Sequence, residues 1–130
     1  MSSLAGQEGV TPKAPTKVAQ RVMRLVLEGE IGQEAVADVS AMIERLPASG
    51  VLQVVIDCSE VSHFDYRGVR PLLRRVEALR EQGGDVRLAG LSPYVFAIFR
   101  SAGADGAFDY FASVDDAVAS FTRGIAAFGG

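Results

Sequence analysis

The spacing of the hydrophobic positions changes along the chain, and each change predicts a new element of secondary structure. Residues 21–30, RVMRLVLEGE, are rich in valine and leucine and predict a strand that ends at Gly29. Residues 17–20 either begin this strand or form a separate short one. From Gln33 the apolar residues recur at intervals of three and four, which is the spacing of one face of a helix. This apolar stripe comprises Ala35, Val36, Val39, Met42, Ile43 and Leu46.

The middle of the chain predicts a buried strand followed by a second helix. Pro47 and Gly50 end the first helix, and residues 51–56 after them are almost all apolar. Such a run is typical of a strand that is covered on both faces. A polar stretch, which we interpret as a short loop, then leads to Asp65 at the start of a second amphipathic helix. The apolar stripe of that helix comprises Val69, Leu72, Leu73, Val76 and Leu79, and Gln82-Gly83-Gly84 closes it.

The last third of the chain repeats the alternation of strand and helix. Residues 85–89 predict a short strand and residues 108–111 predict another. Between them, Ser92 and Pro93 are suited to the N-cap and the first position of a helix. Ser113 is suited to cap a terminal helix whose first turn is acidic. The alternation from the second strand onward predicts an α/β domain with parallel strands.

Composition limits the function classes. With 130 residues, 48% of them hydrophobic and 22% charged, the chain is predicted to form one globular domain. Its formal net charge of -3 does not favour binding to nucleic acid, which calls for a basic stripe. No apolar run approaches the roughly 18 residues of a membrane span, and no signal-peptide pattern begins the chain. We therefore expect a cytoplasmic protein that does not bind a membrane.

The candidate catalytic and metal-binding residues are few. Cys58 and His63 are each the only residue of their type, which argues against a disulfide framework, a metal site and a catalytic triad. We expect Cys58 to be buried and inert, and we expect neither a cofactor nor enzymatic activity. Gly, Ser and Pro dominate residues 1–15, so we predict a flexible leader there and a folded domain over residues 16–130.

Several short motifs follow one another in an order that resembles a known family. They are Glu28-Gly29-Glu30-Ile31, the segment from Val55 to Asp65, Gly83-Gly84, Gly90-Leu91-Ser92-Pro93 and Phe108-Asp109-Tyr110-Phe111. Together they resemble the STAS domain, the fold of bacterial anti-sigma factor antagonists, of stressosome proteins and of the cytoplasmic tails of sulfate transporters. The resemblance covers about residues 22–121. It implies a single α/β domain with a mixed, mostly parallel sheet of four to five strands, packed with about four helices.

The resemblance also implies a regulated docking surface. In the family, a serine or threonine directly after the aspartate is phosphorylated at the helix N-terminus, where added negative charge repels a partner. In this chain that position is Tyr66, and Arg67 follows where a small residue is usual. A tyrosine oxygen lies further from the backbone, so we expect a kinase that acts on the serine not to modify Tyr66. The implied partner-binding residues are Asp65, Tyr66, Arg67, Gly68 and Arg70.

Three residues near this surface leave alternatives open. Pro71 cannot donate a backbone hydrogen bond, so the second helix either starts late, after an irregular turn, or is kinked there. Ser59 and Ser62 are alternative phosphorylation sites, although serines in such loops usually cap backbone groups.

The third helix presents a second candidate surface. Its inward stripe leaves Tyr94 and Phe96 pointing elsewhere, which suggests an interface; alternatively, both pack under the leader or under the tail at residues 125–128. Arg67, Arg70 and Arg74 form a basic strip along the second helix. That strip is either a solvated face or a contact for an acidic partner.

Together, these observations lead to the hypothesis of a non-catalytic adaptor for signal transduction and transcription regulation in bacteria. It would bind a protein partner such as an anti-sigma factor, a serine-kinase-like protein or another signalling protein, without a serine phosphoswitch. One alternative is a self-associating scaffold subunit, such as a homodimer. The other is a binder of a nucleotide or lipid at the strand ends, although the chain has no glycine-rich phosphate loop.

Overall fold

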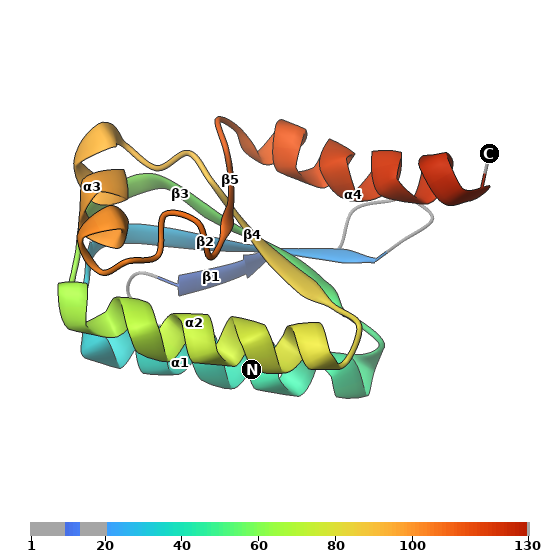
Figure 1. Ribbon diagram of the computed structural model, residues 1–130. Coiled ribbons are helices and arrows are strands. Elements are labelled where there is room, and N and C mark those ends of the chain that lie inside the picture. Colours follow the sequence, from blue (N-terminus) through green and yellow to red (C-terminus); the bar gives the residue numbers. More distant parts are fainter. Residues whose placement is uncertain (1–9, 14–20, 130) are drawn as a thin grey trace.

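The computed structural model describes residues 10–13 and 21–129, so the strand start expected at residues 17–20 lies outside the described residues. The chain forms strands that alternate with helices, as predicted (Figure 1). In order, the elements are β1 (Val10–Lys13), β2 (Val22–Ile31), α1 (Gln33–Arg45), the short 3-10 helix η2 (Leu46–Ser49), β3 (Gln53–Phe64), α2 (Tyr66–Glu81), β4 (Asp85–Ala89), α3 (Pro93–Ser101), β5 (Asp109–Phe111) and α4 (Val114–Gly129).

The strands form one sheet in the order β1-β2-β3-β4-β5. Strands β2 to β5 are parallel and β1 is antiparallel to β2. Because every parallel connection contains a helix, the topology follows from the alternation of strand and helix in the sequence. The prediction of a mixed, mostly parallel sheet with about four helices is confirmed.

Strand β1 corrects part of the predicted leader. Val10–Lys13 pairs with β2, from Val10 opposite Leu27 to Lys13 opposite Arg24. Pro12 is tolerated because β1 is an edge strand, bonded on one side only. The proline and small polar residues around it obscured the strand in the sequence, and the leader prediction was wrong for these four residues.

The helices cover both faces of the sheet. Figure 1 shows α1 and α2 side by side on one face, α4 on the opposite face and α3 at one end. Along β3 the side chains alternate: Val54 and Ile56 join the larger core with α1 and α2, whereas Val55 joins the smaller core with Ala117 and Phe121. This double coverage explains why residues 51–56 are almost all apolar.

Strand β3 is longer than predicted, and the short polar loop expected before Asp65 does not exist. The pairing of β3 with β4 ends at Asp57 opposite Ala89, but β3 continues beside β2 as far as Phe64 opposite Ile31. The register between β2 and β3 shifts twice in this extension. The extension pairs on one side only, so its sequence is polar enough to suggest a loop.

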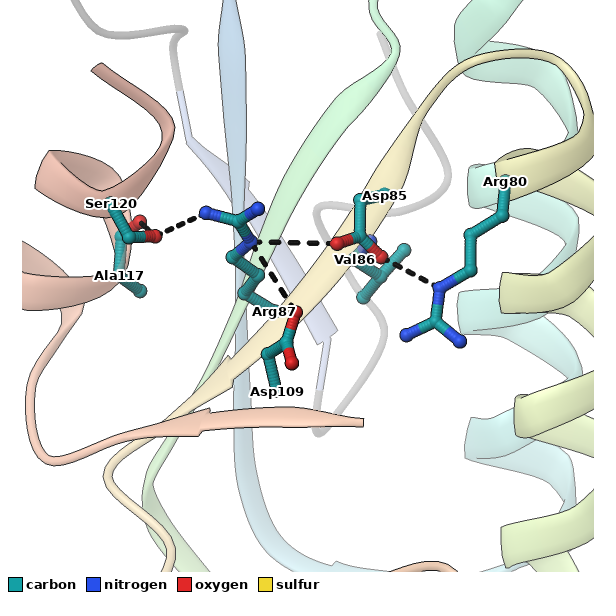
Figure 2. A network of polar contacts seen from close by, with 7 residues as sticks. All are labelled: Arg80, Asp85, Val86, Arg87, Asp109, Ala117 and Ser120. Atoms are coloured by element: carbon teal, nitrogen blue, oxygen red, sulfur yellow. Dashed lines mark hydrogen bonds and ion pairs between the residues drawn. The ribbon is translucent and has the colours of Figure 1, made fainter. Parts of the chain in front are cut away.

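A network of charged side chains connects β4 to its neighbours (Figure 2). The Nε atom of Arg87 lies 3.5 Å from Asp85 and 3.9 Å from Asp109, and its guanidinium also donates to the Ser120 hydroxyl of α4. On the other side, Arg80 of α2 donates to Asp85 at 2.8 Å. The network thus links α2, β4, β5 and α4 to one another.

Candidate functional site

The candidate site begins at Asp65, which caps α2. Asp65 Oδ1 accepts a hydrogen bond from the backbone N–H of Arg67 at 2.8 Å. The Arg67 side chain closes back on the same carboxylate, with Nη2 3.1 Å from Oδ2. These hydrogen bonds from Arg67 lower the pKa of Asp65, so the carboxylate stays ionised below the pH at which an ordinary aspartate is protonated. The cap at Asp65 therefore persists at neutral and mildly acidic pH.

Pro71 does not delay the start of α2. The helix runs from Tyr66 to Glu81 with Pro71 inside it, which excludes one of the two alternatives, a late start after an irregular turn over residues 66–70. A proline in the interior leaves the carbonyl four residues earlier, that of Arg67, without its helical donor. Burial of the apolar stripe of α2 and the Asp65 cap compensate for that loss. Pro71 itself is exposed.

His63 and Tyr94 connect the end of β3 to the start of α3. The Nδ1 atom of His63 lies 2.8 Å from the Tyr94 hydroxyl, and the two ring centroids are 5.7 Å apart. Both side chains are exposed. Tyr66 and Tyr94, each 56% exposed, are the large hydrophobic residues that the described part of the chain leaves most open to solvent. Both stand at the end of the sheet where β3 meets α2.

The sequence did not predict that His63 belongs to this surface. The sequence shows it only as a lone histidine two residues before Asp65. Its contact with Tyr94 spans 31 residues and arises from the parallel pairing of β3 and β4. No local pattern encodes a contact of that kind.

Phe96 does not form an exposed aromatic pair with Tyr94, which was one of the two alternatives for these residues. Its ring is half-buried and packs edge-on against Tyr110, with the centroids 4.9 Å apart. The guanidinium of Arg100 lies 5.9 Å from the same ring. Phe96 thus packs α3 against β5, and Tyr94 is the exposed aromatic residue of α3.

Gly68 and Arg70, two of the expected partner-binding residues, differ in exposure. Gly68 is buried, and a Cβ atom there would lie 2.8 Å from Val36 Cγ2 of α1. It therefore serves the close packing of α1 and α2. Arg70 is exposed, and its Nη2 atom lies 3.6 Å from the place where a Cβ would stand on Gly103.

The two serines before Asp65 lie on β3 and not in a loop. Ser59 donates its hydroxyl hydrogen to Asp57 at 2.7 Å, and its backbone N–H donates to the same carboxylate. Asp57 is buried and pairs with Arg24 at 3.5 Å. The hydroxyl of Ser59 is thus part of a local polar cluster. Both Ser59 and Ser62 are exposed, and the modification of either stays a prediction.

Asp57 and Asp65 lie in separate environments. Asp57 is held within the sheet by Arg24, and Asp65 caps α2 at its surface. Across residues 10–13 and 21–129, no group of three or more His, Cys, Asp or Glu side chains is arranged to hold a metal ion. In the same part of the chain, no helix has both the length and the apolar character needed to cross a membrane.

Cys58 is expected to be almost unreactive in the folded protein. Burial raises the pKa of its thiol to about 12, and the neighbouring Asp57 carboxylate adds to the rise. At pH 8 its thiolate fraction is then roughly a thousandfold smaller than that of an ordinary thiol. Alkylation by iodoacetamide, followed by mass spectrometry with and without urea, should show a rate at least a hundredfold lower without urea. Rates within tenfold of each other would contradict this prediction.

The fold and the site together define an α/β domain whose distinctive surface lies where β3 ends and α2 begins. The family model of the STAS domain matches residues 13–117, and the chain belongs to that family. The resemblance inferred from the short motifs is confirmed. No curated protein sequence gives a significant match.

Solved structures with the same fold include two that are described as anti-sigma factor antagonists. SpoIIAA in its unphosphorylated form is 21% identical, with a TM-score of 0.66 over 89% of this chain and 99% of that one. An anti-sigma factor antagonist from Mycobacterium paratuberculosis is 22% identical, with a TM-score of 0.68 over 85% and 92% of the two chains. A single-residue variant of RsbS from Moorella thermoacetica is 17% identical, with a TM-score of 0.70 over 88% and 95%.

Proposed function

We propose that this protein is a non-catalytic protein-binding module similar in role to the anti-sigma factor antagonists. Its docking surface comprises His63, Asp65, Tyr66, Arg67 and Tyr94, with Arg70 at its margin. One observation carries the proposal: Tyr66 and Tyr94, contributed by different helices, are both 56% exposed at the same end of the sheet. Exposed aromatic residues gathered in one place are typical of binding surfaces.

The contacts around the two tyrosines favour a surface that is ordered before a partner arrives. The hydrogen bond between His63 and Tyr94 restrains both side chains, and the Asp65–Arg67 ion pair restrains the first turn of α2 next to Tyr66. A restrained side chain loses less entropy on binding, so more of the contact energy contributes to affinity. Tyrosine adds a large contact area for few rotatable bonds.

The sequence at the helix start supports binding without control by serine phosphorylation. Tyr66 is the first residue of α2, the position that a serine or threonine occupies in the family. Ser59, a nearby hydroxyl, is engaged with the buried Asp57. We infer that the partner, an anti-sigma factor, a serine-kinase-like protein or another signalling protein of the cytoplasm, is bound constitutively or under another form of control.

Replacing either Tyr66 or Tyr94 by alanine is expected to weaken partner binding by about tenfold or more, since central aromatic residues carry most of an interface's energy. Tyr66→Glu should weaken binding further by placing a negative charge beside Asp65. Affinity capture from native lysate with quantitative mass spectrometry identifies the partner, and calorimetry with the purified partner measures the change. Glu77→Ala, at an exposed position further along α2, is the matched control.

Three results would count against the proposal. Unchanged capture by both alanine variants would show that the partner docks elsewhere. Stoichiometric phosphorylation of Tyr66, Ser59 or Ser62 would show that a phosphoswitch persists. A dimer seen by light scattering across a concentration series, and lost in Tyr94→Ala, would favour the self-associating scaffold.

A further inference from the structure

A groove of about 610 Å³ runs between α1 and α2 on the side of these helices that faces away from the sheet. Its floor consists of small or compact side chains, and charged or polar residues form its rim. The lining includes Ala37 and Ala41 of α1 and Pro71, Arg74, Arg75 and Ala78 of α2.

The groove follows both helices for three turns. On α1 it extends from Gln33 to Glu44, and on α2 from Arg67 to Ala78, which corresponds to about 16 Å along each helix axis. The buried Gly68 lets the helices approach closely at one end, since any Cβ there would meet Val36. Small side chains along this length leave room for a further helix at the usual interaxial distance of about 8–10 Å.

The charge of the groove is opposite to that of the whole chain. Three arginines and one glutamate line it, whereas the chain has a formal net charge of -3. Arg75 pairs with Glu44 at 3.6 Å and Arg67 pairs with Asp65 at 3.1 Å. Arg74 is exposed and has no ion-pair partner among the described residues. This local positive charge favours an acidic occupant.

We propose that the α1/α2 groove is a second docking site, which accepts an acidic amphipathic helix from a partner protein. Both walls are helices, so the groove offers no strand edge to an extended peptide. The occupant must therefore satisfy its own backbone hydrogen bonds, as a helix does. Its apolar face contacts Ala37, Ala41 and Pro71, and its flanking carboxylates pair with Arg74.

A second copy of this chain is the less suitable occupant. In a symmetric dimer the groove of one copy would face the same groove of the other. Two surfaces with the same excess of arginine would then meet in one interface, which is unfavourable.

The groove and the surface proposed above can be tested separately. Ala41 and Arg74 line the groove and lie outside the surface that contains Tyr66 and Tyr94. Substitutions at these two positions therefore test the groove alone. Tyr66→Ala and Tyr94→Ala test the first surface alone.

The decisive experiment is a selection with the full-length protein. A displayed library of 16-residue helices carries Leu and Ala on one face and Glu, Lys or Gln at the flanking positions. We expect the selected helices to contain at least fivefold more Glu than Lys. Their affinity should fall at least tenfold with Arg74→Glu, which reverses the free charge, and with Ala41→Trp, which fills the groove. Arg100→Glu on α3 makes the same change in net charge outside the groove and should alter affinity less than twofold.

Three results would overturn the proposal. The selection yields no binding helix, or the selected helices contain equal shares of Glu and Lys. The third is undiminished binding to both groove variants, provided that these variants retain the wild-type thermal unfolding temperature. Loss of binding with Tyr66→Ala would assign the helices to the first surface. A dimer in sedimentation equilibrium that dissociates in Ala41→Trp would identify a second copy as the occupant.

Discussion

Replacing Gly84 by alanine is expected to lower the free energy of unfolding by at least about 3 kcal/mol, a large share of the roughly 5–15 kcal/mol typical of a domain. A Cβ atom at this position would lie 2.2 Å from the carbonyl oxygen of Leu52 and 2.9 Å from Leu79 Cγ. The Leu52 carbonyl accepts a hydrogen bond from Asp85 at 2.9 Å, at the point where β4 begins beside β3. A methyl group at residue 84 must therefore displace backbone and break that contact.

Two other glycines, Gly83 and Gly106, provide controls for this prediction, which urea denaturation followed by circular dichroism can measure. Gly83 has a φ of 91° with no atom within 4 Å of an added Cβ, so Gly83→Ala should cost about 1–2 kcal/mol through backbone strain alone. Gly106→Ala adds a Cβ into open space and should change stability by less than about 0.5 kcal/mol. A loss for Gly84→Ala no larger than that for Gly83→Ala would refute the steric explanation.

Signals confined to a few neighbouring residues were sufficient to predict most element boundaries. Ser92 accepts a hydrogen bond from Val95, and Ser113 accepts one from Asp116, as their positions before helices predicted. Asp85–Ala89 is the strand that the alternation indicated. These features depend on the geometry of one turn or one strand, so the sequence contains all the information that they need.

The two errors in strand assignment share a physical cause. Strand β1 and the extension of β3 beyond Asp57 each pair with β2 alone. A strand with one open side has no need of continuous apolar residues, so its sequence resembles a loop. The identity of its partner strand is a non-local property, which the composition of the strand does not reveal.

The candidate surfaces show the same division between local and non-local information. The Asp65 cap predicted that α2 begins at Tyr66, whereas Pro71 left open a later start, which the structure excludes. The contact between His63 and Tyr94, the packing of Phe96 on Tyr110, and the α1/α2 groove all join residues from separate elements. Only the arrangement of those elements in space brings them together.

Replacing Phe99 by alanine is expected to lower the free energy of unfolding by about 3–5 kcal/mol and to loosen the docking surface. Phe99 is fully buried, and its ring centroid lies 4.8 Å from that of Phe64 and 5.6 Å from that of Phe108. Phe64 is the last residue of β3, directly before the cap of α2. Phe99 thus holds α3, and with it Tyr94, against the strand end that carries His63.

Urea denaturation measures the loss of stability, and NMR of the His63 ring reports on its contact with Tyr94 in the folded fraction. Phe99→Leu keeps most of the buried volume and should cost less than about 1.5 kcal/mol, with the His63 signals little changed. Phe96→Ala, at a half-buried position on the same helix, should cost less than Phe99→Ala. Since Phe99 connects α3 to the end of β3 through Phe64, a Phe99→Ala protein that retains both its stability and the His63 signals of the wild type would show that other contacts position Tyr94.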